Sequence, residues 1–235
     1  MKKAALVTGS AKGIGRAILL ALAGRGFDVA VHYRRSEAEA EQTRLEAERL
    51  GVRAVKLRAD VTEPTEAQAL VDKAVETLGG LGVLVNNVGD YLKKPVDRFS
   101  AEEWRAMLDS NLNAPFFLSQ AALPHLVGGG GGRVVNLGFA GAQNLIARPN
   151  IAAYAAAKAG LIVYSKSLAV QVAARGVTVN VVAPGVAENS VSKPLEEIPA
   201  GRLAGLDELA GAVLFFVDNP YLTGQVLEVA GGFNL

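Results

Sequence analysis

A tyrosine and a lysine at helical i, i+4 spacing, Tyr154 and Lys158, carry the clearest chemical signal in the sequence. Side chains at this spacing share one face of a helix, so the lysine ammonium can lie close to the phenol. A nearby positive charge favours the ionised phenol and lowers its pKa from about 10. We therefore predict a general acid that can release its proton near neutral pH.

A glycine-rich turn joins the apolar run Ala4 to Val7 to a helical segment, residues 16–23. Its glycines let the backbone approach a pyrophosphate at the positive end of the helix. An ordinary βα turn can contain similar glycines, but the strand before and the helix after favour dinucleotide binding. The predicted contacts are Gly9, Ser10, Lys12, Gly13, Ile14 and Gly15.

The end of the next apolar run lacks the carboxylate that holds the adenosine 2′-hydroxyl in NAD-binding folds. It carries Arg34, Arg35 and Ser36 instead, with Lys12 nearby in the glycine turn. Guanidinium groups bind a 2′-phosphate that a carboxylate would repel. We therefore predict NADPH (NADP+) as the cofactor. Ser36 and Glu39 also have the spacing of a capping box at a helix start, as do Ser100 and Glu103.

Short β-branched runs alternate with segments of helical period along the chain, at residues 4–7, 29–33, 52–57, 83–85, 134–137, 177–182 and 226–229. Several runs are apolar on both faces, which indicates a parallel sheet. The alternation indicates right-handed crossovers. The prediction is an α/β fold: a Rossmann-type doubly wound parallel β-sheet with helices on both faces, in a single domain over residues 1–235.

The composition excludes several functional classes. A net charge of +1 provides no field that would gather nucleic acid or an anionic membrane. There is no cysteine, and His32 and His125 are far apart, so neither a disulfide nor a metal site is expected. The apolar stretches are too short or too interrupted for a bilayer span or a signal peptide. We expect a soluble cytoplasmic protein.

Six separated motifs occur in the order found in one enzyme family: TGxxxGIG at 8–15, Asp60-Val61, Asn86 to Gly89, Asn111, Tyr154 to Lys158 and Pro184-Gly185. The whole chain thereby resembles the short-chain dehydrogenases/reductases. Residues 154–168, 177–185 and 198–203 are most similar to bacterial 3-oxoacyl-acyl-carrier-protein reductases. Residues 32–36 and Tyr91 are also similar to pteridine reductases.

The resemblance implies a catalytic role for three residues. Tyr154 protonates the carbonyl oxygen as a hydride arrives from nicotinamide. Lys158 also holds the nicotinamide ribose, and Asn111 supports a water relay to Lys158. Hydride transfer with proton donation is the implied reaction.

The resemblance also implies further cofactor contacts. Asp60 and Val61 lie at positions that hold the adenine. The ribose and nicotinamide side is lined by Asn87, Gly89, Pro184 and Gly185. From the residues alone, Asp60 could equally cap the next helix, and Pro184-Gly185 could be a simple turn.

The sequence departs from the family pattern after the strand at 134–137. Phe139 stands where a serine hydroxyl would bind the substrate carbonyl, and the aspartate of pteridine reductases is absent too. Loss of one such donor commonly costs about 10² to 10³ in turnover. Gln143 or Asn144 is the predicted substitute donor, and Tyr91 is a predicted stacking partner for substrate.

A second departure concerns residues 186–200, predicted to form a short substrate lid. Asn189 stands where family members usually have a threonine, and so short a lid either leaves an open cleft or suits a long substrate such as a pantetheine-linked acyl chain. The resemblance further implies a homotetramer formed through helices at 102–126 and 152–174 and through the C-terminal residues 226–235.

These observations predict an NADPH-dependent oxidoreductase that reduces a carbonyl to an alcohol, most similar to a 3-oxoacyl-acyl-carrier-protein reductase of fatty acid synthesis. The substrate is a small-molecule or acyl-thioester carbonyl; no nucleic acid, membrane or metal is expected. One alternative is a pteridine-like or other small-carbonyl reductase. The other is a catalytically weak NADP-binding regulatory protein, because the usual serine is absent.

Overall fold

The computed structural model describes residues 1–190 and 192–233. These residues form a seven-stranded sheet in the order β3-β2-β1-β4-β5-β6-β7, and every neighbouring pair of strands is parallel. The predicted doubly wound parallel fold is therefore confirmed. The strands are β1 (Ala4–Val7), β2 (Asp28–Tyr33), β3 (Ala54–Arg58), β4 (Val83–Asn86), β5 (Gly132–Leu137), β6 (Val177–Pro184) and β7 (Val226–Val229).

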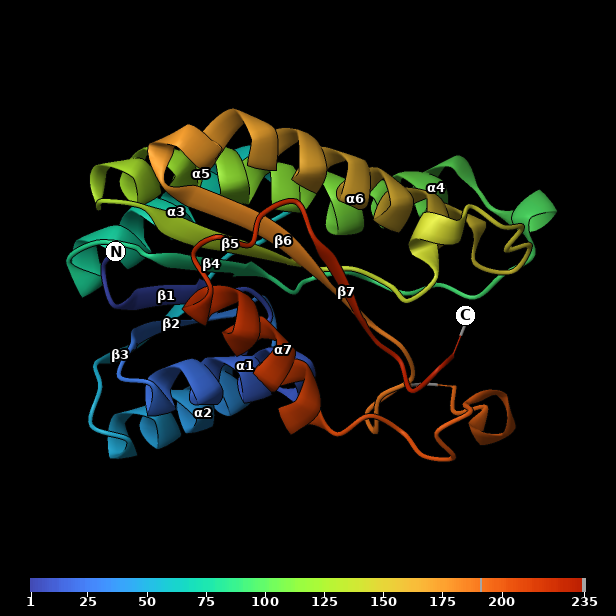
Figure 1. Cartoon of the computed structure of the whole chain (residues 1–235), viewed down its shortest axis with the longest axis horizontal. Helices are drawn as coiled ribbons and strands as arrows, with labels where there is room; N and C mark the ends of the chain where they lie inside the picture. The colour runs from blue at the N-terminus through green and yellow to red at the C-terminus, as the bar shows by residue number, and fades with distance from the viewer. Residues whose placement is uncertain (191, 234–235) are drawn as a thin grey trace.

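Helices cover both faces of the sheet, as Figure 1 shows: α1, α2 and α7 lie below it, and α3 to α6 lie above it. The α-helices are α1 (Gly13–Gly24), α2 (Glu37–Arg49), α3 (Pro64–Leu78), α4 (Ala101–Leu108), α5 (Ala114–Gly128), α6 (Ala152–Val172) and α7 (Leu206–Asp218). Shorter elements are the 3₁₀ turns η1 (Val96–Arg98), η3 (Ala142–Asn144), η4 (Ala173–Arg175) and η5 (Leu195–Glu197) and the π-helical turn η2 (Asp109–Asn113).

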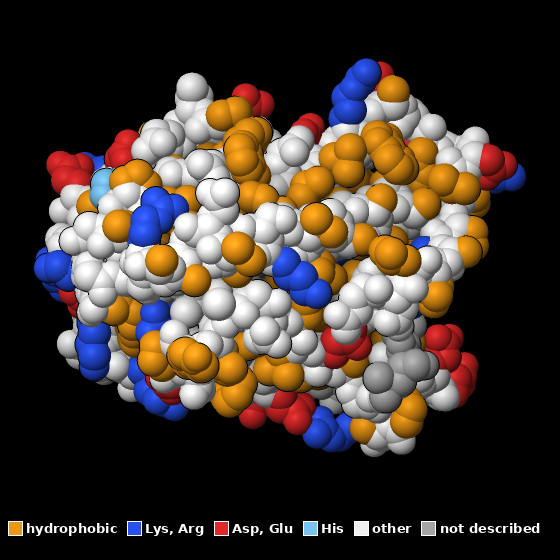
Figure 2. All heavy atoms as spheres, turned by 45° about the horizontal axis from the view of Figure 1, so that its top comes forward, with side chains coloured by type: hydrophobic (Ala, Val, Ile, Leu, Met, Phe, Trp, Pro, Cys, Tyr) orange, Lys and Arg blue, Asp and Glu red, His pale blue; other side chains and the backbone are white. Residues whose placement is uncertain are grey.

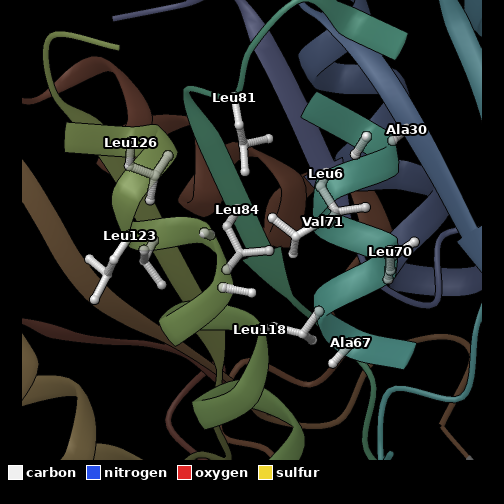
Figure 3. Close-up of a cluster of buried hydrophobic side chains, with 14 of the residues drawn as sticks. Leu6, Ala30, Ala67, Leu70, Val71, Leu81, Leu84, Leu118, Leu123 and Leu126 are labelled. Carbon is white, nitrogen blue, oxygen red and sulfur yellow. The ribbon is translucent and has the colours of Figure 1, made fainter. Parts of the chain in front are cut away.

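Apolar side chains fill the space on each side of the sheet. On the α3 and α5 side, Leu6 and Leu84 from the sheet meet Leu118 of α5, and all three are almost fully buried (Figure 3). Burying one such side chain contributes about 1.5–3 kcal/mol. A second cluster fills the α1 and α7 side. The strands read as apolar on both faces because both faces are covered.

One expected helix, residues 102–126, is divided by a π-helical turn. α4 ends at Leu108, η2 spans Asp109–Asn113, and α5 begins at Ala114. A π turn inserts an extra residue into the helical ladder and is often found at functional sites. Here it contains Asn111, one of the predicted catalytic residues.

The outer faces of α5 and α6 carry exposed apolar side chains among polar ones (Figure 2). Phe116, Val163 and Val170 are exposed at 43%, 67% and 83%. These helices are the ones through which a homotetramer is predicted, and that assembly stays a prediction. No helix within the described ranges is both long and apolar enough to cross a bilayer. The predicted C-terminal contact includes residues 234–235, which lie outside the described residues.

Candidate active site

The glycine turn between β1 and α1 has a backbone that only glycine allows. Gly9 and Gly13 have φ of +62° and +60°, in the left-handed region. A Cβ atom on Gly15 would lie 2.5 Å from the carbonyl oxygen of Gly9. The N-cap residue of α1, Lys12, makes no side-chain capping bond. The first N–H groups of α1 can therefore bind an anionic group, as the sequence predicts.

A cavity of about 740 Å³ lies beside this turn, at the carboxyl ends of β1, β2 and β3. Among the predicted cofactor residues, it is lined by Gly9, Lys12, Gly13, Ile14, Gly15, Arg34, Arg35, Ser36, Asp60, Val61, Asn87 and Gly89. We call it the cofactor cavity. Its three cationic side chains lie at the same opening as the uncapped helix start, so these residues fit a phosphorylated dinucleotide.

Ser10 is a predicted cofactor residue whose side chain faces the turn instead of the cavity. Its hydroxyl donates to the carbonyl oxygen of Val7 at 2.7 Å and accepts from the backbone N–H of His32 at 3.1 Å. The side chain is fully buried. Ser10 therefore holds the turn in shape and has no free hydroxyl to offer a ligand.

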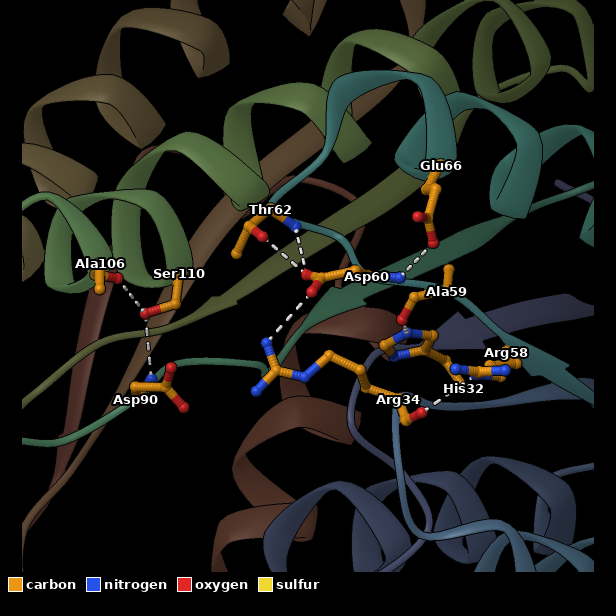
Figure 4. Close-up of polar contacts among 10 residues, drawn as sticks. All are labelled: His32, Arg34, Arg58, Ala59, Asp60, Thr62, Glu66, Asp90, Ala106 and Ser110. Carbon is orange, nitrogen blue, oxygen red and sulfur yellow. Dashed lines mark hydrogen bonds and ion pairs between the residues drawn. The ribbon is translucent and has the colours of Figure 1, made fainter. Parts of the chain in front are cut away.

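His32 is a polar residue at this cavity whose role the sequence did not reveal (Figure 4). Its Nδ1 accepts from the backbone N–H of Gly9 at 2.9 Å, so Nε2 carries the proton and donates to the carbonyl oxygen of Ala59 at 3.1 Å. Burial lowers the pKa of His32 to about 4, so the ring is neutral and joins two walls of the cavity. The available signal was a histidine inside an otherwise apolar strand.

Arg34 and Asp60, assigned to the phosphate and to the adenine respectively, pair with each other across the cavity at 3.3 Å (Figure 4). Thr62 donates to Asp60 Oδ1 from its backbone N–H at 3.1 Å and from its hydroxyl at 2.6 Å. Partial burial opposes ionisation of Asp60, but these bonds and the charge of Arg34 outweigh it and lower the pKa. Asp60 caps the turn before α3, while the N-cap of α3 itself is Glu63.

The predicted capping box at Ser36 and Glu39 is wrong. Ser36 is the N-cap of α2, but its side chain makes no capping bond. Its backbone, at φ −89° and ψ 65°, lies outside the extended region that capping geometry uses. By contrast, the box expected at Ser100 and Glu103 is present at the start of α4.

A second cavity of about 460 Å³ adjoins the first and shares Ile14, Asn87, Gly89 and Asn189 with it. We call it the substrate cavity. The predicted residues that line it are Tyr91, Asn111, Phe139, Tyr154, Lys158, Pro184 and Gly185. Residues of the expected lid 186–200 line it too, including Asn189, Ser190 and Pro194; Val191 lies outside the described residues.

Tyr154 and Lys158 project from the first turns of α6 into the substrate cavity. Lys158 Nζ lies 5.7 Å from the centroid of the Tyr154 ring and donates to the carbonyl oxygen of Leu137 at 2.7 Å. The predicted lowering of the Tyr154 pKa is not found, because burial, with a smaller contribution from Tyr91, raises it. Burial lowers the pKa of Lys158 to about 7. Desolvation, which helical spacing does not reveal, outweighs the charge effect.

Asn111 turns its amide oxygen toward Lys158. Its Nδ2 donates to the carbonyl oxygens of Asp90 at 2.9 Å and Met107 at 3.0 Å, which fixes the amide orientation. Its Oδ1 is buried without a partner among the described residues. A Cβ on Gly89 would clash with this oxygen and would lie 3.3 Å from Lys158 Nζ. Asn111 therefore presents an acceptor beside the lysine, as the predicted relay requires.

A buried polar chain fastens α6 to the sheet. Asn86 Nδ2 donates to Asn136 Oδ1 at 2.7 Å, and Asn136 Nδ2 donates to Ser165 Oγ at 2.8 Å. Ser165 in turn donates to the carbonyl oxygen of Leu161 at 2.6 Å. These residues fix the helix that carries Tyr154; Asn86 belongs to a motif named in the sequence analysis, but Asn136 and Ser165 do not. Two of them are asparagines inside apolar strands.

Phe139 lies edge-on to Tyr154, with the ring centroids 5.5 Å apart, so no hydroxyl is present at this position. The predicted substitute donors Gln143 and Asn144 are exposed and do not line the cavity. Gln143 donates to Glu228 at 3.3 Å, because η3 turns this part of the loop outward. The described cavity lining instead contains Arg148, which the sequence analysis did not identify.

A doubly wound sheet with a glycine turn at one cavity and an acid–lysine pair at the next is the arrangement of a dinucleotide-dependent oxidoreductase. The chain belongs to the short-chain dehydrogenase family, whose model, described as short chain dehydrogenase, matches residues 3–199.

Relatives span nearly the whole chain. The 3-oxoacyl-[acyl-carrier-protein] reductase FabG of Escherichia coli is 39% identical over 98% of this chain and 96% of its own length. A short chain dehydrogenase from Burkholderia cenocepacia, solved in complex with NADP, has a TM-score of 0.93 and 34% identity, covering 100% and 99% of the two chains. Acetoin dehydrogenase YohF from Salmonella typhimurium has a TM-score of 0.91 and 34% identity, covering 99% and 96%.

Proposed function

We propose that the protein is an NADPH-dependent carbonyl reductase. The main support for this proposal is the lining of the two adjoining cavities. Arg34, Arg35 and Lys12 line the cofactor cavity, and Tyr154 and Lys158 line the substrate cavity that adjoins it. The cations and the uncapped start of α1 would hold the phosphates. When bound, the reduced nicotinamide supplies the hydride.

The residues of the substrate cavity are suited to proton donation. Burial keeps Tyr154 protonated, so the phenol can donate to a carbonyl oxygen that is becoming an alkoxide. Lys158, with a pKa of about 7, can return a proton toward the phenolate. The unpartnered Asn111 Oδ1 can accept a hydrogen bond in a relay that resupplies the lysine. A proton would thus pass from solvent, through a water held by Asn111 Oδ1 and then through Lys158, to the Tyr154 phenolate.

The substrate class that we propose is a 3-oxoacyl thioester, as in the name of the Escherichia coli relative. The cavity supports this class with apolar wall residues, among them Ile151, Val186 and Phe233. Among the described residues of the expected lid, Val186, Asn189, Ser190, Ser192 and Pro194 line this cavity, and so short a cover would suit a chain that enters from solvent. An acyl-thioester reductase of this kind would be a soluble cytoplasmic enzyme and, by family resemblance, a homotetramer.

Oxidation of NADPH, followed at 340 nm, tests the proposal. The substrates are acetoacetyl-N-acetylcysteamine, diacetyl, a pterin and a simple cyclic ketone, each also tested with NADH. We expect turnover to be fastest with the thioester and NADPH. A preference for diacetyl or the pterin would show that the substrate is not a 3-oxoacyl thioester. Tight NADPH binding without any turnover would overturn the proposal that the protein is a reductase.

A further inference from the structure

Arg148 has an unusual environment for a charged side chain. It lies in the loop between η3 and α6 and lines the substrate cavity. Its guanidinium carbon lies 5.6 Å from the centroid of the Phe139 ring. Its Nε and Nη2 atoms are buried, and neither has a hydrogen-bond partner within the described ranges. Burying unpaired charged donors is costly, so this arrangement calls for an acceptor from elsewhere.

The two unpaired nitrogens belong to the same edge of the guanidinium group. Nε–H and one N–H of Nη2 point in nearly the same direction, which is the fork that binds oxygen atoms in a fixed geometry. None of the described residues that line the substrate cavity is an aspartate or glutamate. The natural acceptor for this edge is therefore an oxygen atom of the substrate.

The position of Arg148 matches the donor that the site lacks. Phe139 stands where the family pattern places a serine, and its ring is near both groups: its centroid lies 5.6 Å from the Arg148 guanidinium carbon and 5.5 Å from the centroid of the Tyr154 ring. Gln143 is turned outward to Glu228. Arg148 is thus a strong donor that lines the same cavity as Tyr154 and contacts the residue that replaces the serine.

We propose that Arg148 donates a hydrogen bond to the reacting carbonyl oxygen of the substrate, in the role of the absent serine. This inference rests on the proposed carbonyl reduction. The hydride forms a bond to the carbonyl carbon, the C=O π electrons move to the oxygen, and that oxygen takes the proton of Tyr154. Arg148 keeps all its protons and stabilises the negative charge that develops on the oxygen. Because Nε and Nη2 are buried in the structure, this role requires their edge to turn toward the cavity when the substrate binds.

The same geometry explains why Phe139 is compatible with catalysis. The aromatic face supports the cation and keeps water from the donor, which strengthens its interaction with a developing alkoxide. A serine at position 139 would add little, because Arg148 already donates the hydrogen bond that the serine hydroxyl would provide. The effect of a Phe139→Ser substitution should therefore depend on whether Arg148 is present.

Steady-state kinetics of four proteins test this role: the unmodified chain, Arg148→Met, Phe139→Ser and the double variant. We expect Arg148→Met to lower kcat by about 10²-fold, with KM and the NADPH dissociation constant changed by less than about 3-fold. Phe139→Ser alone should not raise kcat. In the Arg148→Met background it should recover at least about 10-fold, because a hydroxyl restores one donor.

Two further measurements separate a donor from a structural support. Guanidinium ion added to Arg148→Ala at millimolar concentration should raise its kcat about 10-fold, while Arg175→Met, an exposed control on η4, should behave as the unmodified protein. Retention of kcat by Arg148→Met would overturn the inference, as would parallel losses of NADPH affinity and thermal stability. A defect confined to substrates with a free carboxylate would also overturn it. Absence of turnover by the unmodified protein would instead overturn the proposed function itself.

Discussion

The cofactor cavity and the substrate cavity share a wall, but their polar groups are in opposite states. At the cofactor cavity, both ring nitrogens of His32 are hydrogen-bonded and Asp60 is held by Thr62 and Arg34. At the substrate cavity, Asn111 Oδ1 and two nitrogens of Arg148 have no partner in the described part of the chain. The protein itself supplies hydrogen-bond partners for these groups of the cofactor cavity. The unpaired groups of the substrate cavity are left for the substrate and the relay that we propose.

This difference predicts a division of roles. Buried polar groups that are paired contribute to folding, whereas unpaired ones lower stability, and functional sites are one place where that cost is tolerated. Substitutions around the cofactor cavity should therefore affect both stability and binding. Substitutions in the substrate cavity should affect turnover with little loss of stability.

Tyr154→Phe separates the two cavities most sharply. It removes the acid and almost no contact area, so we expect kcat to fall by about 10³-fold or more. The NADPH dissociation constant and the free energy of unfolding should stay nearly constant. Steady-state kinetics, an intrinsic-fluorescence titration with NADPH and urea unfolding measure these three quantities. If most of the turnover remains, Tyr154 is not the acid.

Mild acid should lower the stability of the protein through His32, at the cofactor cavity. Its folded pKa, about 4, lies below the ordinary value of 6.5, so the unfolded chain binds the proton first as pH falls. The free energy of unfolding should therefore decrease from pH 6.5 to pH 4, by up to about 3 kcal/mol from this group. Urea unfolding across that range measures the slope.

Variants of the two histidines are the controls for the pH range from 6.5 to 4. His32→Asn keeps an acceptor for the Gly9 N–H but cannot titrate, so its slope should be shallower than that of the unmodified protein. His125→Asn, on α5, should retain the full slope. Identical slopes for His32→Asn and the unmodified protein would show that the acid sensitivity comes from carboxylates.

Replacing Arg34 and Arg35 together with alanine tests the cofactor cavity at its charged end. We expect NADPH affinity to fall about 10- to 100-fold, from loss of charge-assisted hydrogen bonds to the 2′-phosphate, while NADH affinity changes less than about 3-fold. At saturating NADPH, kcat should be unchanged. Arg49→Ala, at the other end of α2, is the matched control. Equal affinity of the unmodified protein for both cofactors would contradict the assignment.

The smallest expected effect is on the stability of Arg148→Met. The methionine keeps the apolar stem and removes two unpaired buried donors, so the free energy of unfolding should rise or change by less than about 0.5 kcal/mol. His32→Ala should lose about 2 kcal/mol in the same urea titration, because it leaves the Gly9 N–H and the Ala59 carbonyl unpaired. If Arg148→Met instead lost more free energy of unfolding than His32→Ala, the unpaired groups of the substrate cavity would be as important for stability as the paired groups of the cofactor cavity.

Local patterns were enough to predict the sheet, the glycine turn and the Tyr154–Lys158 pair. The turn is determined by glycines at positions where a Cβ would clash, and alternation of strand and helix leaves few possible topologies. The pKa direction of Tyr154 was not predictable, because it depends on burial by Tyr91 and other residues distant in sequence. Spacing alone gives proximity and not desolvation.

Arg148 shows a different limit. Its position depends on the loop before α6, where η3 turns Gln143 outward and Leu145 adopts a left-handed φ of 51°, rare for a residue with a side chain. No repeat or spacing rule specifies such a loop. Position 139 carries no hydroxyl, and the donor that we propose, Arg148, lies a few residues beyond Gln143 and Asn144, in a part of the loop that the sequence pattern does not mark.

Asn189 lines both cavities, and its position bears on the order in which the two ligands bind. Its amide lies 2.8 Å from the point that a Cβ on Gly13 would occupy, so this lid residue lies directly against the start of α1. Because Asn189 belongs to both linings, a dinucleotide that displaced this residue from the turn would change the entrance to the substrate cavity. We therefore expect a compulsory order of addition, with the dinucleotide first on and last off, and product release limited by the return of Asn189.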